Sequence, residues 1–267
     1  MRILTWNLWW QFGPWEQRLD AVVATLRHWA PDVLCLQEVW TQADGRSSAR
    51  VIADALGHPI LVDEIGFTLG EVGFGNAVTS RFPIVGRDVV ALPTGGEHDE
   101  HRRLVIAELD TGGEAITVAC THLNWRPDHG HVRRAQVTAV GEALARQRRA
   151  VTVLCGDLNA EPTSDEVRAL TGQAPLSAPG LVFTDAWAAA GHGAGNTWDN
   201  ANPFAATERE PDRRIDYVLV AWPYPAGYGH PVRAELVGTA PVAGVWPSDH
   251  YGVVVDLADP PAPISAP

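Results

Sequence analysis

Residues 151–159 read Val151-Thr152-Val153-Leu154-Cys155-Gly156-Asp157-Leu158-Asn159, an apolar run that leads directly into a carboxylate and an amide. The run 151–154 is rich in β-branched residues, which suits a strand covered on both faces. Gly156 is expected to let the backbone turn tightly after that strand. Asp157 and Asn159 would then project from the strand end, where buried polar groups are costly unless they serve a site. The stretch therefore indicates a hydrolytic centre.

Outward from this stretch, strand-like and helical patterns alternate along the chain. Strands are expected at 2–8, 33–37, 76–80, 104–109, 115–121, 151–155, 215–220 and 252–256. Apolar stripes of helical spacing predict helices over 19–29 and 137–144, and Thr163 with Glu166 predicts a capping box that opens a short helix. Because Thr111-Gly112-Gly113 predicts a hairpin rather than a crossover, an α/β sandwich fits better than an all-parallel sheet.

The 267 residues allow one large domain or two small ones, and no shift in composition marks a linker. We expect a single domain over 1–258. Residues 259–267 are predicted to form a disordered tail, because the prolines there cannot continue a sheet. The stretch 191–213 is rich in Gly, Asn, Pro and charge, which is typical of either an ordered functional loop or a mobile lid.

Charge and cysteine content narrow the class of protein. Lys and Arg total 20 against 32 Asp and Glu, so the net charge is −12, which disfavours non-specific binding to duplex nucleic acid. Cys35, Cys120 and Cys155 each lie in an apolar run and are predicted to be buried free thiols. Residues 1–7 enter a strand pattern without a signal-peptide core, and no apolar run is long enough to span a bilayer. We expect a cytoplasmic protein, monomeric by default.

Polar side chains close five further predicted strands. A single such residue is more often a cap or a turn former than part of a site. Six such positions, in strands that can end near one another, favour one shared site. These five are Asn7, Glu38, His122, Asp216 and the pair Asp249-His250.

The chemistry of this set points to metal-assisted hydrolysis. Its oxygen-bearing members suit Mg²⁺ or Mn²⁺ rather than zinc, and crowded carboxylates require a cation to offset their repulsion. His250 is a natural base for a water molecule, and Asp216 can hold its ring in one tautomer. His122 can donate a hydrogen bond to a developing negative oxygen. The oxygen-bearing members are Asn7, Glu38, Asp157, Asn159 and Asp249.

The residues and their order resemble the endonuclease/exonuclease/phosphatase superfamily of Mg²⁺-dependent phosphoesterases. The resemblance implies a four-layer α/β/β/α sandwich with two packed, mixed and largely antiparallel sheets. Its motifs run from residue 5 to residue 250 and are Thr5-Trp6-Asn7, Gln37-Glu38, Gly75-Asn76-Ala77-Val78-Thr79-Ser80-Arg81, Thr121-His122, Gly156-Asp157-Leu158-Asn159, Arg214-Ile215-Asp216-Tyr217 and Ser248-Asp249-His250.

The resemblance also implies roles for the oxygen-bearing residues. Glu38 would be the principal ligand of Mg²⁺ or Mn²⁺, with Asn7 and Asp249 in the same metal cluster. Asp157 would position or activate the attacking water, and Asn159 would bind the scissile phosphate.

Two histidines complete the roles that the resemblance implies. His250, paired with Asp216, matches the catalytic histidine of the family, and His122 matches its second phosphate-facing group. Two assignments of the general base remain open at this point. The base is either Asp157 or the His250–Asp216 pair.

Candidate substrate contacts lie outside these motifs, with one exception, Asn76. Arg102 and Arg103 can bind a phosphate bidentately or form a surface pair at a strand edge. Trp125 follows His122. The aromatic stretch 9–15 beside the predicted metal site is either core or an apolar wall for a lipid, sugar or base, and residues 124–126 and 198–200 would extend that wall. The arginines between 133 and 149 are predicted to form a solvated face.

Three classes of function compete on these grounds. The leading hypothesis is a phosphodiesterase or phosphomonoesterase that acts on a small or lipid-linked phosphoester. The alternative is a nuclease that uses the same site on DNA or RNA, although Lys is absent and no basic cluster flanks the predicted cleft. A non-catalytic binding module would be expected to lose a metal or histidine position, and none is lost.

Overall fold

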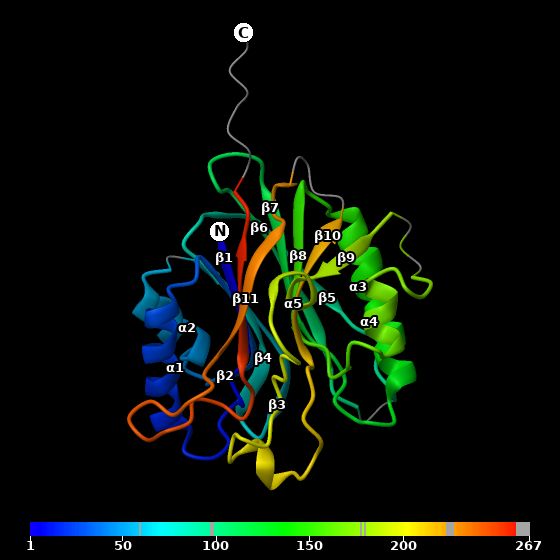
Figure 1. Cartoon of the computed structure of the whole chain (residues 1–267). Helices are drawn as coiled ribbons and strands as arrows, with labels where there is room; N and C mark the ends of the chain where they lie inside the picture. Colours follow the sequence, from blue (N-terminus) through cyan, green and yellow to red (C-terminus); the bar gives the residue numbers. More distant parts are fainter. Residues whose placement is uncertain (59, 97–98, 177, 179, 223–226, 260–267) are drawn as a thin grey trace.

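The computed structural model describes residues 1–58, 60–96, 99–176, 178, 180–222 and 227–259, and within them the strands form two six-stranded sheets (Figure 1). The first sheet has the order β11 (Pro231–Val237), β12 (Gly252–Leu257), β1 (Arg2–Asn7), β2 (Val33–Thr41), β4 (Val72–Ser80) and β3 (Ile60–Leu69). The second sheet has the order β5 (Ile84–Ala91), β6 (Arg103–Leu109), β7 (Ile116–His122), β8 (Val151–Asp157), β10 (Asp216–Trp222) and β9 (Val182–Asp185).

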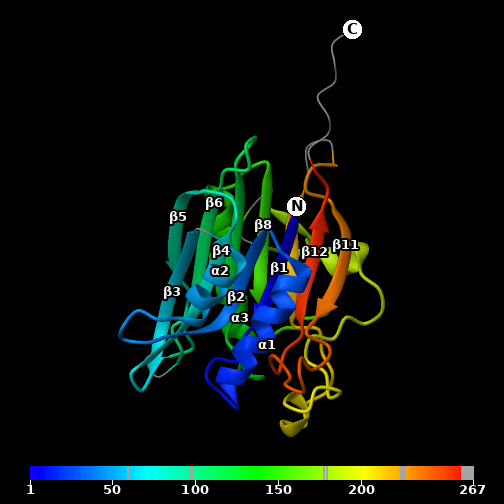
Figure 2. The same cartoon turned by 90° about the vertical axis from the view of Figure 1, so that its left-hand side faces the viewer.

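Helices cover the outer face of each sheet, which confirms the predicted four layers (Figures 1 and 2). On the first sheet these are α1 (Trp15–Trp29) and α2 (Ser48–Leu56), and on the second α3 (Gly130–Arg146) and α4 (Asp165–Leu170). A third apolar cluster fills the space between the sheets, and the short helix α5 (Ala186–Ala190) adds Trp187 to it. The buried free thiols Cys35, Cys120 and Cys155 lie in this inner layer, as predicted.

Each sheet is antiparallel except for one central pair. In the first sheet β1 and β2 are parallel and are joined by α1, and in the second sheet β7 and β8 are parallel and are joined by α3. The β6–β7 pair is antiparallel, which confirms the predicted hairpin. The two parallel pairs send four carboxyl ends to one edge, where the amino ends of β10 and β12 also arrive (Figure 1, lower end).

The sequence pattern predicted the interior strands of both sheets and missed the edge strands. The four missed strands, β3, β5, β9 and β11, are the outermost strands of the two sheets. Strand β5 shows the reason, because every one of its residues is half-buried or exposed and no continuous apolar run marks it. Helices α2 and α5 were also not predicted.

Two local predictions need correction, and a third concerns residues outside the described ranges. The helix α4 is capped by Ser164 rather than by Thr163, and the Glu166 carboxylate accepts a hydrogen bond from Arg133 instead of closing a capping box. Gly156 does not start a turn, since β8 continues to Asp157. Residues 260–267, most of the predicted tail, lie outside the described residues. Within the described residues, no helix is both long enough and apolar enough to span a membrane.

Candidate active site

A cleft of about 290 Å³ opens at the edge where the strand ends meet. Its floor is polar, its walls are aromatic and its rim carries glutamates. The floor contains Glu38, His122, Asp157, Asn159, Asp249 and His250, and the walls contain Trp9, Phe12, Phe67, Phe74, Trp125 and Trp198. Six carboxylates line the described part of the cleft against two arginines, Arg102 and Arg213, and each arginine is paired with a glutamate.

The second sheet delivers three predicted site residues in one row. His122, Asp157 and Asp216 are direct neighbours across β7, β8 and β10. Asp157 Oδ2 lies 3.4 Å from His122 Nε2, and Asp157 Oδ1 accepts a hydrogen bond from the Asn159 amide. Burial, with repulsion from Asp216, raises the pKa of Asp157 to about 6. Burial also lowers the pKa of His122 well below its ordinary value, so this imidazole is neutral.

Gly156 makes this row possible. A Cβ at this position would lie 1.9 Å from the Thr121 carbonyl oxygen of the neighbouring strand, and the residue has φ +144°. Only glycine tolerates both conditions. The residue therefore allows β7 and β8 to approach closely at the point where His122 and Asp157 enter the cleft.

His250 joins the two sheets at the cleft. It precedes β12 of the first sheet, and its Nδ1 lies 2.9 Å from Asp216 Oδ2 of the second. Its Nε2 therefore faces the cleft, 3.9 Å from Asp157 Oδ2. Burial opposes the charged form of His250, but Asp216, Asp249 and Asp157 raise its pKa well above the ordinary value. The ring of Trp198 packs edge-on against it at 5.1 Å.

The first sheet delivers Glu38 through an irregularity of β2. The pairing register of β2 with β4 shifts between Leu36 and Val39, and Glu38 has φ +54°. This bulge turns the Glu38 carboxylate towards the cleft. Burial, with repulsion from Asp249, raises the pKa of Glu38 to about 7, and burial also raises the pKa of Asp249. The two carboxylates therefore repel each other in a buried site.

Asn7 bridges the two halves of the site as a hydrogen-bond donor. Its Nδ2 donates to Glu38 Oε1 at 3.1 Å and to Asp157 Oδ2 at 3.0 Å. Its Oδ1 accepts from the Trp9 amide at 3.0 Å. The arrangement differs from the expected oxygen ligand, because the oxygen of Asn7 faces the backbone and not the carboxylates. A metal-ligating role for Asn7 therefore stays a prediction.

The donor set fits a hard divalent cation. Glu38 and Asp249 are buried carboxylates whose mutual repulsion is only partly offset by neighbouring cations, which is the situation that a bound Mg²⁺ or Mn²⁺ relieves. A second group, made of Asp157, Asp216 and His250, has its candidate ligand atoms within 4.8 Å of one another. In that group Asp216 and His250 are already joined by a hydrogen bond, so Glu38 and Asp249 are the better candidates.

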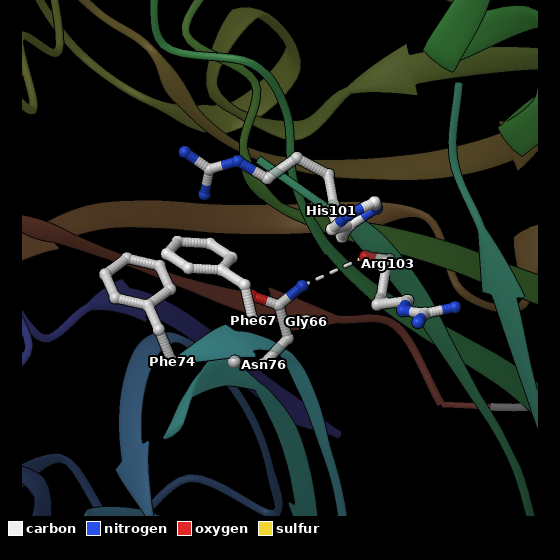
Figure 3. A pocket seen from close by; sticks show the side chains of 8 residues that line it. Gly66, Phe67, Phe74, Asn76, His101 and Arg103 are labelled. Carbon is white, nitrogen blue, oxygen red and sulfur yellow. Dashed lines mark hydrogen bonds between the residues drawn. The ribbon is translucent and has the colours of Figure 1, made fainter. Parts of the chain in front are cut away.

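Of the predicted substrate contacts, Arg102 reaches the cleft, but Asn76 and Arg103 do not line it. Arg102 is buried, is paired with Glu100 and lies over the stacked rings of Phe67 and Phe74. Asn76 donates from Nδ2 to the Arg103 carbonyl at 3.0 Å and so ties β4 to β6 (Figure 3). Asn76 and Arg103 instead line a small neighbouring pocket (Figure 3).

The aromatic stretch 9–15 was interpreted as either core or cleft wall, and each interpretation holds for part of it. Trp9 and Phe12 line the cleft, and Phe12 is 42% exposed. Trp10 and Trp15 turn away from it, Trp10 to donate to the Gly73 carbonyl and Trp15 to pack edge-on against Trp40. On the opposite side Trp125 lines the cleft and is 51% exposed.

The stretch 191–213 packs onto the site with defined contacts. Trp198 pairs with Arg213 and with His250, and of the predicted wall residues 198–200 it alone lines the described cleft. The Nδ2 of the buried Asn202 donates to the carbonyls of Ser248 and Asp249. The short 3₁₀ helix Ala205–Thr207 follows. These contacts fit the ordered functional loop.

One arginine differs from the surface role that the sequence suggested, and a second one was overlooked. Arg133 belongs to the predicted solvated face, yet it is buried, pairs with Glu166 at 2.9 Å and donates to the carbonyls of Asn124 and Arg126. It thereby holds the loop that carries Trp125. Arg18 was not singled out, although its position four residues before Val22 places a charge on the apolar stripe of α1.

Two packed sheets with a carboxylate and histidine cleft at one edge define a metal-dependent phosphoesterase type of site. The profile of the Endonuclease/Exonuclease/phosphatase family matches residues 4–250, and the chain belongs to this family. Enzymes of this family use divalent metal ions.

Two relatives of known name are similar to this chain in sequence. The chain is 27% identical over 180 residues to the putative neutral sphingomyelinase of Drosophila melanogaster, a match that covers 61% of this chain and 40% of that protein. It is 24% identical over 261 residues to tyrosyl-DNA phosphodiesterase 2 of Gallus gallus, covering 94% of this chain and 65% of that protein. The chain therefore spans less than two thirds of either relative.

A solved structure of an endonuclease/exonuclease/phosphatase from Beutenbergia cavernae superposes with a TM-score of 0.72 at 26% identity. The match covers 99% of this chain and 73% of that one. The likeness extends over both sheets, since nearly the whole chain is covered.

Proposed function

We propose that this protein is a metal-dependent phosphoester hydrolase that directs a water molecule in line at a small or lipid-linked phosphoester. The observation that carries the proposal is the position of Asp157. Its Oδ2 lies 3.4 Å from His122 Nε2 and 3.9 Å from His250 Nε2, on a floor shared with Glu38 and Asp249. This arrangement offers a proton acceptor and two imidazoles around one reacting centre.

The metal site in this proposal consists of Glu38 and Asp249. A bound Mg²⁺ or Mn²⁺ would neutralise charge on the phosphate and polarise its P–O bonds. Asn7 keeps the Glu38 and Asp157 carboxylates in place by donating to both.

Asp157 is the residue that we propose to orient the water and accept its proton. Its Oδ1 is held by the Asn159 amide, so Oδ2 is the atom directed at the reacting centre. His250 is fixed by Asp216 through Nδ1 and presents Nε2 to the phosphate or to its leaving oxygen. His122 is neutral and has its Nε2 directed at the same place, where it can donate to a developing oxyanion.

Several features of the cleft favour a small or lipid-linked substrate over a nucleic acid. Its walls are aromatic, Phe12 and Trp125 are exposed at the mouth, and both lining arginines are paired with glutamates. Six lining carboxylates disfavour a polyanion. The printed name of the fly relative, a putative neutral sphingomyelinase, agrees with a lipid-linked phosphodiester.

The test is a substrate panel with the metal-stripped protein, to which Mg²⁺ or Mn²⁺ is added back. The panel contains p-nitrophenyl phosphate, bis-p-nitrophenyl phosphate, p-nitrophenylphosphocholine and vesicles of sphingomyelin or phosphatidylcholine. Hydrolysis is expected only with the added metal, and Glu38→Ala serves as the control for contaminating enzymes. The proposal fails if no member is hydrolysed, or if Glu38→Ala retains the wild-type rate.

A nuclease is the second candidate, and one observation favours it. The similarity to the chicken tyrosyl-DNA phosphodiesterase 2 covers 94% of this chain. Aromatic walls can also stack bases without basic residues nearby. Incubation of wild-type and Glu38→Ala protein with plasmid and single-stranded oligonucleotides separates the candidates, since metal-dependent cleavage that is faster than hydrolysis of every lipid and nitrophenyl ester would select the nuclease.

A further inference from the structure

Arg18 is a buried cation on α1 that is bound by backbone carbonyls alone. It is 2% exposed and forms no salt bridge with any carboxylate among the described residues. Burial lowers its pKa to about 10, with Asp249 and Glu38 opposing the shift, so the guanidinium stays charged at neutral pH. Its nitrogens donate to five carbonyls, at distances of 2.8–3.1 Å: those of Leu8, Trp9, Trp10, Phe12 and Pro247.

Four of these carbonyls belong to the turn between β1 and α1, which has an unfavourable backbone. Trp9 has φ +56° and Trp10 has φ +36°, a region that non-glycine residues occupy only where their surroundings hold them. The guanidinium supplies that hold, because its planar fork places five N–H donors in fixed directions. It also lies 4.7 Å from the centre of the Trp9 ring, a wall of the cleft.

The turn between β1 and α1 also fixes the orientation of the Asn7 side-chain amide. The Trp9 amide can only donate, so the atom of Asn7 that it contacts at 3.0 Å must be the oxygen. The Nδ2 of Asn7 is thereby directed at Glu38 and Asp157. If the turn relaxed, this amide would lose its orientation.

A second arm of Arg18 reaches the loop that carries Asp249. The Pro247 carbonyl accepts from the guanidinium at 3.1 Å. The next residue, Ser248, donates from Oγ to the Asn7 carbonyl at 2.7 Å, and the same Oγ lies 3.2 Å from Asp249 Oδ1. One side chain thus connects the segment of Asn7 with the segment of Asp249 (both at the lower end of Figures 1 and 2).

We propose that Arg18 is a positioning residue of the active site, which acts through the Trp9 amide on Asn7 and through Pro247 on Asp249. Arg18 is not among the described residues that line the cleft. The inference rests on the proposed function for its activity readout, and metal binding provides a readout that does not depend on turnover.

The first test replaces Arg18 by lysine, which keeps the positive charge but cannot reproduce five directed donors. Arg27→Lys, on the exposed side of the same helix, is the matched control. We expect Arg18→Lys to weaken Mn²⁺ binding, measured by calorimetry on the metal-stripped protein, by about 10–100-fold, as loss of an outer-shell partner does. The value of kcat should fall by a similar factor with little change in KM. Arg27→Lys should match the wild type in each measurement.

A double-mutant cycle with Asn7→Ala separates positioning from general destabilisation. If Arg18 acts in part through Asn7, the further loss of kcat caused by Arg18→Lys should be smaller in the Asn7→Ala background, in which only the route through Pro247 remains. Equal losses in both backgrounds would overturn the proposal. All proteins are assayed at temperatures below their own unfolding midpoints. Full wild-type activity of Arg18→Lys under these conditions would also overturn the proposal.

A second variant leaves Arg18 untouched and so avoids the risk of misfolding. Trp9 is replaced by its α-hydroxy acid analogue, which keeps the indole, removes the backbone N–H that Asn7 accepts and weakens the Leu8 carbonyl, which accepts from Arg18. Weaker Mn²⁺ binding by this ester protein supports the proposal, and wild-type Mn²⁺ affinity refutes it. Because this readout needs no substrate, it tests the route from the turn to Asn7 even if the proposed hydrolase activity is absent.

Discussion

His122, Asp157 and Asp216 occupy one row across three hydrogen-bonded strands of the second sheet, whereas the first sheet brings Asn7 and Glu38 to the cleft through irregular backbone. The strand register places this row, and Gly156 permits the close strand approach that it needs. Glu38 depends on a bulge with φ +54°, and Asn7 depends on the left-handed turn at Trp9. The regular half contributes the His122 imidazole and Asp157, the proposed proton acceptor, and the irregular half contributes Glu38, a carboxylate of the proposed metal site.

The difference in backbone regularity suggests a separate role for each half of the site. A register-held row is rigid and keeps proton-transferring atoms at fixed distances, as catalysis by positioned groups requires. A bulge can direct a carboxylate away from the plane of its sheet, which lets Glu38 approach Asp249 from a different strand. His250 belongs to the first sheet but is held by Asp216 of the second, so it couples the two halves.

The largest effect is expected from a change to Asp157, at the centre of the row in the second sheet. Asp157→Asn keeps the shape of the side chain but removes the proton acceptor, and we expect kcat to fall by about 10²–10⁴-fold. Steady-state kinetics on the best substrate of the panel provide the measurement. Asp20→Asn, on the exposed face of α1, is the control. A loss of less than about tenfold would move the role of base to the His250–Asp216 pair.

The second prediction tests whether the row depends on strand approach. Gly156→Ala places a methyl group against the Thr121 carbonyl at a backbone angle that only glycine adopts readily. We expect the free energy of unfolding to fall by about 3 kcal/mol or more. Gly113→Ala is the control, since a methyl group there meets no atom within 4 Å. Urea denaturation of both variants gives the difference, and equal stabilities would show that β7 and β8 can separate without cost.

The third prediction separates the two halves by metal affinity. Glu38→Gln removes a negative charge from the proposed metal site, and we expect Mn²⁺ binding to weaken by at least about 10–100-fold. His122→Asn alters only the regular half and should leave the Mn²⁺ affinity within about twofold. Calorimetry on metal-stripped proteins provides both values. Similar losses in the two variants would mean that the division between the halves is wrong.

The smallest expected effect concerns stability away from the cleft. His58 is buried beside the first sheet, with Nδ1 bonded to Thr79 and Nε2 to the Pro31 carbonyl. Burial lowers its pKa below the ordinary 6.5. The folded state therefore binds the proton less readily than the unfolded state, so this contribution is complete above pH 6.5 and is lost as the pH falls below it.

Because one imidazole binds at most one proton, this effect cannot exceed about 1.4 kcal/mol per pH unit. Urea denaturation between about pH 7.5 and 5.5 should show a steeper loss of stability for the wild type than for His58→Asn. The comparison with the variant removes contributions from the site carboxylates, which titrate in both proteins. Parallel curves would show that His58 has no part in the pH dependence.

Much of the architecture could be predicted because interior strands are marked locally. The eight interior strands are covered on both faces by the inner core and the outer helices, so each appears as an apolar run. Edge strands lack this signal. Strand β5 illustrates the point, since its exposed Val85 and Arg87 alternate with half-buried neighbours.

The candidate site could be predicted in its residues but not in its contacts. The position of Asp157 after an apolar run marked it, and its strand neighbour His122 was marked in the same way. The donor role of Asn7 depends on the Trp9 amide, and no residue pattern reports where that amide points. Arg18 carried a signal that is visible only in retrospect, a charge on the apolar stripe of α1.

By itself, the sequence marked the polar residues of the cleft floor and their order, because hydrophobic runs and the polar residues at their ends are local properties of the chain. Only the tertiary structure decided which of these residues meet. Strand pairing places His122, Asp157 and Asp216 in one row, and sheet packing brings His250 from 34 positions away to Asp216. Such contacts depend on long-range pairing and packing, whose free energy is shared among many residues and leaves no mark at any single position.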